Sequence, residues 1–340
     1  MKNIKNSNKP SFFKKLFIKI SRKLGYEIID QNNFEIVTSN KRIDGHLSTL
    51  GQTSINLPLG EVKITRKVKA LDVIIRTCSS VNMLTQNKSR LFEKEKIEYT
   101  IRTIRSLLNS SKDPDLKQLK INFKVIDHNS TNENLAAIDN VFKEFSIKYS
   151  LINLDVEKFI NKIEKINHRG EKVTDNQKSN MANIHQSLLE AKKCEDLIYF
   201  VEDDYLHKKE SLKEMIFTYE RLASQTNDEI IICPADYPYL YAKSEMTQNF
   251  LGQNYHWRKV NETLCTFLTS KKMIEKYWDK YLSMCEKEHA PFERPLHDIY
   301  EKELCISPIP SLALHFTNVN SIFGLSPNVN WKKIWDQNGN

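Results

Sequence analysis

The sequence lacks several patterns that would assign it to a broad class of protein. Its 6 cysteines are scattered and no two stand at C-x-x-C spacing, which argues against a zinc site or a disulfide framework and favours reduced thiols. There is no run of about 18 apolar residues, so we expect no membrane-spanning helix. There is also no secretion signal, so we expect a cytoplasmic protein. We find no internal repeat.

Extreme charge is also missing. The net charge of +8 is mild, and the basic residues are not gathered into runs interleaved with aromatics, so we expect no nucleic-acid partner. A mild positive charge favours anionic ligands such as nucleotide phosphates or acidic lipid surfaces. The chain has 340 residues, of which 40% are hydrophobic, so it can build one large domain or two modest ones.

Three consecutive carboxylates follow the most distinctive apolar run. The segment 197–201 is rich in Ile, Tyr, Phe and Val, which predicts a buried strand, and it leads directly into Glu202, Asp203 and Asp204. Unpaired carboxylates are costly to bury, so this acidic triplet needs a cation. Because ligands of open α/β sheets bind at the carboxyl ends of strands, we expect a divalent metal ion here with a phosphorylated ligand beside it.

Predicted strands alternate with predicted helices along most of the chain. This order indicates an α/β fold with a mixed, mostly parallel sheet flanked by helices. We expect strands over 71–77, 121–127, 149–152, 197–201, 229–234, 263–268 and 311–316, with an edge strand over 62–68. We expect helices over 94–108, 135–145, 155–170, 179–193, 211–222, 271–281 and 296–302.

The first 70 residues predict a basic extension with one amphipathic helix over 11–25, which Ser11 would cap and Gly25 would end. Apolar side chains fall on one face of this helix and most of its lysines and arginines lie elsewhere, a pattern typical of a helix on an anionic membrane surface. Docking on the protein's own surface is the open alternative. We expect the main domain over 71–320 and a C-terminal tail over 321–340.

The order of polar residues at strand ends resembles a known family. Arg76, Thr77 and Cys78 end the first strand, Asp127 ends the second, the acidic triplet follows the fourth, and Asp298 and His315 come later. This order is similar to that of nucleotide-sugar glycosyltransferases with the GT-A fold, in which the acidic triplet would be the DXD element. The resemblance covers about 71–320 and is closest to bacterial glycosyltransferases of family 2.

The resemblance implies roles for the acidic residues. Asp204 would bind Mn²⁺ or Mg²⁺ at the donor's two phosphates, because hard cations prefer carboxylate oxygens, and His315 would complete the metal shell. Glu202 and Asp203 would contact ribose or sugar hydroxyls or support the metal. The alternatives remain open: the triplet could cap the helix that begins at Ser211, and His315 could be an ordinary core histidine.

A nucleotide would lie beside this metal. Asp127 would accept hydrogen bonds from a base or ribose, and Arg76 and Thr77 would contact a base carbonyl or a phosphate. Asn180 and Asn183 lie one helical turn apart before the acidic strand and would pass close to the base and the sugar. The alternatives are an Asx turn at Asp127, a structural ion pair at Arg76 and ordinary surface polarity at the two asparagines.

The resemblance also implies a general base for the acceptor hydroxyl. Asp298 is the first candidate, about ninety residues beyond the triplet, and Asp236, just past a strand end, is the second. Capping of a short helix after Pro295 is the alternative for Asp298. A base would favour inversion at the anomeric carbon.

The predicted function is transfer of one sugar from a nucleoside-diphosphate sugar to a glycan or glycolipid acceptor, in cell-surface polysaccharide or lipopolysaccharide synthesis at the inner face of a membrane. The sequence departs from processive polymerases, because His256-Trp257-Arg258 only partly matches their Gln-x-x-Arg-Trp motif. A nucleotidyltransferase is one alternative, but it should have a glycine-rich phosphate loop, and no glycine lies near Arg76. A non-catalytic nucleotide-sugar-binding protein is the other.

Overall fold

A computed structural model describes residues 12–26, 62–80, 91–242, 247–316 and 321–339. The chain divides into two units, Met1–Lys63 and Ile64–Asn340. In the first unit the predicted amphipathic helix is present as α1 (Phe12–Lys23), while Ser11 lies outside the described residues. Among the described helices, none is both long enough and apolar enough to cross a membrane.

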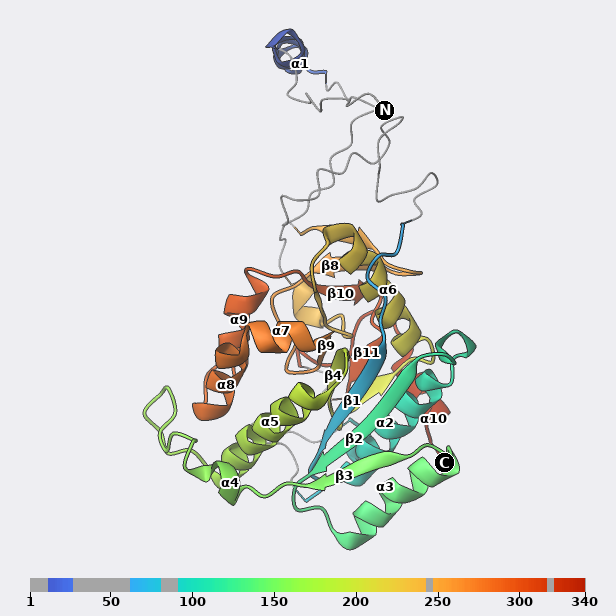
Figure 1. Ribbon diagram of the computed structural model, residues 1–340, viewed down its shortest axis with the longest axis vertical. Helices are drawn as coiled ribbons and strands as arrows, with labels where there is room; N and C mark the ends of the chain where they lie inside the picture. The colour runs from blue at the N-terminus through green and yellow to red at the C-terminus, as the bar shows by residue number, and fades with distance from the viewer. Residues whose placement is uncertain (1–11, 27–61, 81–90, 243–246, 317–320, 340) are drawn as a thin grey trace. The chain divides into compact units, whose positions relative to one another are not determined.

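The second unit is built on a nine-stranded sheet with the order β3-β2-β1-β4-β9-β6-β10-β8-β7 (Figure 1). Its first four strands are parallel to one another, whereas β9 runs antiparallel to both β4 and β6, and β8 antiparallel to β10 and β7. The predicted mixed α/β fold is therefore confirmed, with a parallel core. The strands of this sheet are β1 (Ala70–Thr77), β2 (Lys120–Asp127), β3 (Tyr149–Asn153), β4 (Leu197–Glu202), β6 (Ile231–Ile232), β7 (Asn249–Leu251), β8 (His256–Lys259), β9 (Phe267–Ser270) and β10 (Cys305–Ile309).

Helices cover both faces of this sheet, as the alternation of elements predicts. α2 packs with α3 and α6, whereas α5 packs with α7 and α8 (Figure 1). The helices of this unit are α2 (Lys96–Ser111), α3 (Asn132–Glu144), α4 (Glu157–Ile160), α5 (Asp175–Lys193), α6 (Ser211–Thr226), α7 (Lys271–Lys276), α8 (Trp278–Glu286), α9 (Arg294–Tyr300) and α10 (Trp331–Gln337). Three short 3₁₀ turns and a pair of short strands are also present among the described residues: η2 (Leu91–Glu93), η3 (Pro114–Leu116), η4 (Pro238–Tyr241), and β5 (Tyr205–His207) paired with β11 (Ala313–His315).

The strand order reverses at β1. The chain runs from β1 to β2 to β3 in one direction and then returns to place β4 on the other side of β1. Such a reversal leaves a crevice at the carboxyl ends of the two central strands, where doubly wound proteins bind their ligands. The register brings Arg76 opposite Glu202 and Thr77 opposite Asp127. All eight residues of β1 are buried, which explains its nearly continuous apolar sequence.

The predicted edge strand, one predicted helix and the predicted tail differ from the structure. The segment 62–68 forms no edge strand, because the backbone N–H groups of Thr65 and Arg66 donate to the hydroxyl of Ser224 on α6 instead. The helix predicted over 155–170 is reduced to the single turn of α4. The tail contains α10, whose Trp335 is buried against Tyr99.

The buried imidazole of His207 gives a prediction about stability. Its Nε2 lies 2.6 Å from the Tyr199 hydroxyl, and burial lowers its pKa from 6.5 to about 3. Between these two pKa values only the unfolded chain binds the proton. As the pH is lowered below 6.5, the free energy of unfolding should therefore decrease by up to about 1.4 kcal/mol per pH unit. We expect His207→Gln to flatten this slope in urea unfolding. His256→Gln, which changes an exposed histidine, should not; equal slopes in both variants would contradict the assignment.

Candidate metal and nucleotide site

The acidic triplet forms the turn between β4 and β5. Glu202 is the last residue of β4, and β5 begins at Tyr205. Glu202 and Asp204 lie close to each other, whereas Asp203 makes its contacts elsewhere. The Oδ2 of Asp203 accepts from the Thr100 hydroxyl at 3.1 Å, and its Oδ1 lies 3.2 Å from the Lys96 ammonium group. Asp203 therefore connects the turn to the N-terminal part of α2.

The strand β11 brings His315 to the other two acids. β11 pairs antiparallel with β5, which places His315 opposite Tyr205, and the Phe316 N–H donates to the Asp204 carbonyl at 2.9 Å. His315 Nε2 lies 3.4 Å from Asp204 Oδ2. One ligand atom each of Glu202, Asp204 and His315 lie within 4.8 Å of one another. Two carboxylates and one imidazole this close form a donor set that suits Mn²⁺.

The ring of His315 is oriented by two further contacts. Its Nδ1 lies 2.9 Å from the Phe323 carbonyl oxygen, to which it donates, and its face stacks on Tyr205 at 4.6 Å between ring centroids. Donation from Nδ1 directs the Nε2 lone pair toward the acids, which is how metal-binding histidines are usually held. Burial opposes a charge on the ring, but Asp204 and Glu202 outweigh it and raise the pKa of His315 to about 8. A metal ion would therefore displace a proton from Nε2 at neutral pH.

Arg76 lies beside these acids. Its guanidinium donates to Glu202 Oε1 at 2.7 Å and to Asn180 Oδ1 at 3.1 Å. Burial raises the pKa of Glu202, the Arg76 charge lowers it, and the Asp204 charge raises it again. The structural ion pair considered for Arg76 is thus formed, while contact of Arg76 or Asn180 with a nucleotide stays a prediction. Glu202 remains 32% exposed and can still bind a ligand from outside.

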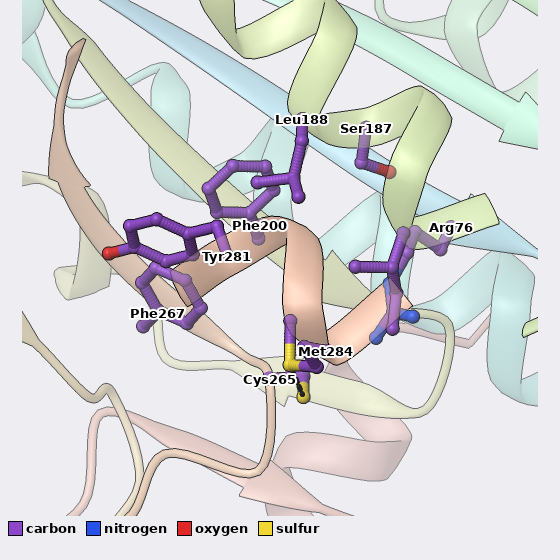
Figure 2. A pocket seen from close by; sticks show the side chains of 9 residues that line it. Arg76, Ser187, Leu188, Phe200, Cys265, Phe267, Tyr281 and Met284 are labelled. Carbon is purple, nitrogen blue, oxygen red and sulfur yellow. Dashed lines mark hydrogen bonds between the residues drawn. The ribbon is translucent and has the colours of Figure 1, made fainter. Parts of the chain in front are cut away.

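A cavity lies behind Arg76, between α5, α8 and the sheet (Figure 2). Figure 2 shows Phe200, Phe267 and Tyr281 grouped together and Arg76 on the opposite side. The lining of the cavity is mostly apolar and consists of Arg76, Ile184, Ser187, Leu188, Phe200, Cys265, Phe267, Tyr281 and Met284. Such a lining does not suit a diphosphate, so this cavity does not fit the predicted nucleotide.

Asp127 is held within its own turn. Its Oδ1 accepts from the hydroxyls of Thr77 and Ser130, each at 2.6 Å, and its Oδ2 accepts from the Ser130 N–H at 3.1 Å. These bonds hold Asp127 in a local turn, although its backbone partner lies three residues on and not two as in an Asx turn. A nucleotide contact of Asp127 or Thr77 stays a prediction. On α5, Asn183 Nδ2 donates to the Ile126 carbonyl at 3.1 Å, and its Oδ1 is buried with no protein partner.

The two candidate bases lie apart from the three clustered ligands. Asp298 is exposed on α9 and forms an ion pair with Lys280, whose hydrogen bond lowers the pKa of Asp298. Asp236 is fully buried, and it accepts from Arg258 and, at 2.6 Å, from the Tyr241 hydroxyl. Neither carboxylate has a described contact with Glu202, Asp204 or His315. General-base catalysis by either one stays a prediction.

Sequence reasoning missed a carboxylate that supports the neighbouring loop. Glu293 is buried and accepts from the backbone N–H groups of Thr263, Leu264 and Cys265. Leu264 and Cys265 have φ values of 52° and 59°, a left-handed conformation that is strained for such side chains. The N–H of Glu202 is 3.4 Å from the Thr266 hydroxyl in the same loop. Periodicity could not reveal this role, because it depends on contacts between distant segments.

Asp236 gives a prediction that separates a structural role from a catalytic one. Removing one partner of a buried ion pair leaves the other charge uncompensated, so Asp236→Asn should lower the free energy of unfolding by about 3–5 kcal/mol. Tyr241→Phe removes one hydrogen bond to the same carboxylate and should cost only about 1 kcal/mol. Urea unfolding measures both. A stable Asp236→Asn protein that has lost all activity would instead support Asp236 as the base.

Comparison with known proteins gives similarity of fold alone. No family model and no curated protein matches the chain. A 1–349 fragment of S. aureus TarS in complex with UDP is 13% identical, with a TM-score of 0.39, over 70% of this chain and 57% of the fragment. The chain spans 35% of a longer TarS structure. The galactosyltransferase LgtC, in complex with donor and acceptor sugar analogs, is 12% identical, with a TM-score of 0.38, over 69% of this chain and 72% of its own.

A third similar structure is the mannosyltransferase PcManGT from Pyrobaculum calidifontis in complex with GDP-Man and Mn²⁺. It is 10% identical, with a TM-score of 0.37, over 80% of this chain and 63% of its own. The similar structures thus include a galactosyltransferase and a mannosyltransferase, the class of protein that the sequence resembles.

Proposed function

We propose that the chain is a metal-dependent glycosyltransferase that moves one sugar from a nucleoside-diphosphate sugar to an acceptor hydroxyl. The observation that carries this proposal is the cluster of Glu202, Asp204 and His315, whose ligand atoms lie within 4.8 Å of one another. The cluster stands at the carboxyl end of β4, beside the point where the strand order reverses, which is where a nucleotide would bind.

The residues of the cluster have distinct tasks in this proposal. Glu202, Asp204 and His315 would hold Mn²⁺ or Mg²⁺, Arg76 positions Glu202, and Asp203 fixes the turn to α2. When bound, the ion supplies positive charge that offsets the negative charge on the departing diphosphate. The proposed acceptor is a glycan or glycolipid of the cell surface, and inversion is the proposed stereochemical course.

The proposed location is the cytoplasm. All six cysteines are free and five of them are buried, as is usual in a reducing compartment. Nucleoside-diphosphate sugars carry two negative phosphates, and the mildly basic chain, with a net charge of +8, would attract them.

A donor screen tests the proposal. We would incubate the full chain with UDP-, GDP-, CMP- and dTDP-linked sugars and Mn²⁺, with water as the acceptor of the sugar, and in parallel with nucleoside triphosphates and sugar 1-phosphates, and measure released nucleotide and pyrophosphate. Nucleoside diphosphate released from one or two of the diphosphate donors, dependent on the metal, is the expected result. Pyrophosphate release from a nucleoside triphosphate and a sugar phosphate would indicate a nucleotidyltransferase instead. Binding of a donor without any release would indicate a non-catalytic binding protein.

A further inference from the structure

The helix α1 exposes an apolar face that the metal site does not explain. At 100° per residue, five apolar side chains of α1 fall within an arc of about 140°. They are exposed by 74% (Phe12), 78% (Phe13), 43% (Leu16), 61% (Phe17) and 49% (Ile20). Among the described side chains of α1, Ile18 and Ser21 are the less exposed ones, and both lie outside this arc. An exposed apolar patch of this kind marks an interaction surface.

Cations accompany this face. Four basic side chains of the helix are exposed: Lys15, Lys19, Arg22 and Lys23. Arg22 and Lys23 lie in the last turn, and the helix carries no acidic residue. Around the helix axis, Lys19 and Lys23 lie at or close to one edge of the apolar arc. Lys15 and Arg22 lie farther from that edge, outside the arc. Long basic side chains at the edge of an apolar face can reach lipid headgroups while their aliphatic stems cover acyl chains.

We infer that α1 binds the surface of an anionic lipid bilayer. An apolar face alone would suit a protein partner as well as a lipid surface. This face has three aromatic rings and two aliphatic side chains, and the helix has basic residues but no acidic one. The positive charge complements anionic headgroups and therefore favours a lipid surface. The helix would lie in the plane of the interface, with Phe13, Phe17 and Ile20 toward the acyl chains. Being 12 residues long, it is too short to span the bilayer.

The inference goes beyond the proposed function and does not depend on it, since it concerns only α1. If the sugar acceptor is a glycolipid, attachment to the bilayer would also raise its local concentration.

Vesicle flotation of the full chain tests the inference. We expect the protein to float with vesicles of phosphatidylcholine and phosphatidylglycerol at 3:1 and to stay at the bottom with phosphatidylcholine alone. Phe13→Ser/Phe17→Ser should abolish flotation by weakening binding at least about 100-fold. Lys15→Gln/Lys19→Gln/Lys23→Gln should weaken it by roughly 100-fold, because each cation contributes roughly fivefold.

A matched triple variant controls for net charge. Lys117→Gln/Lys332→Gln/Lys333→Gln removes three exposed lysines from other parts of the chain and should float like the wild type. Equal loss in both triple variants, or flotation that Phe13→Ser/Phe17→Ser does not change, would overturn the inference. So would a lowered melting temperature of Phe13→Ser/Phe17→Ser, which would show the face docked on the protein itself. Dissociation of an oligomer by the same variant without vesicles would show a second copy on this face and would overturn it as well.

Discussion

Asp204→Asn is expected to lower kcat for sugar transfer by about 10³-fold, equivalent to about 4 kcal/mol of transition-state stabilisation. The amide keeps the size of the side chain and removes the negative charge that faces His315 at 3.4 Å. A neutral oxygen is a poorer ligand for a hard cation, so charge on the departing diphosphate would no longer be offset. Initial rates with the donor identified by the screen, at saturating Mn²⁺, measure the effect.

Asp298→Asn tests the first candidate base in the same assay. Asp298 is exposed and paired with Lys280, whose hydrogen bond lowers the pKa of Asp298. If Asp298 acts only in this surface ion pair, its variant keeps activity within about twofold, since such a pair contributes little. A loss of about 10²–10⁴-fold in Asp298→Asn would instead establish it as the general base. Equal activity of Asp204→Asn and the wild type would contradict the proposed function.

His315→Gln is expected to weaken Mn²⁺ binding by about 100-fold and to reduce the preference for Mn²⁺ over Mg²⁺. The imidazole is the one nitrogen donor of the cluster, and nitrogen ligands favour manganese over magnesium. Competition between the two ions, followed by the electron paramagnetic resonance signal of free Mn²⁺, measures both effects.

Tyr205→Phe controls for the setting of His315. It keeps the ring that stacks on the imidazole at 4.6 Å and removes only the hydroxyl, which lies 2.7 Å from that of Tyr237. Mn²⁺ affinity close to wild type is expected in this variant. If His315→Gln also bound Mn²⁺ with wild-type affinity, the histidine would not be a ligand.

The parallel half of the sheet was predictable from sequence because each strand carries its own signal. β1, β2 and β4 are short apolar runs that end in polar residues, and the predicted bounds differ from the observed ones by no more than one residue at either end. The later strands are shorter and are defined by their neighbours: β6 keeps only Ile231 and Ile232 of the segment predicted over 229–234. Local apolar character cannot set such bounds, because pairing with β9 and β10 decides them.

The candidate site was also predictable only in part. The triplet was predicted from residue type and order and His315 from the family resemblance. The separation of Asp203 from its neighbours was not predicted, because it depends on contacts with Lys96 and Thr100 on α2. The Asp236–Arg258 pair joins a loop to β8 and was hidden for the same reason: the two residues are distant in sequence.

An anomalous difference map of crystals grown with MnCl₂ and a nucleoside diphosphate tests the central claim most directly. The account predicts one strong manganese peak bonded to Asp204 and His315, with the diphosphate on its open side and Glu202 bonded to it directly or through water. A diphosphate bound at the end of β4 with no manganese peak beside these residues, or a peak elsewhere on the chain, would contradict it.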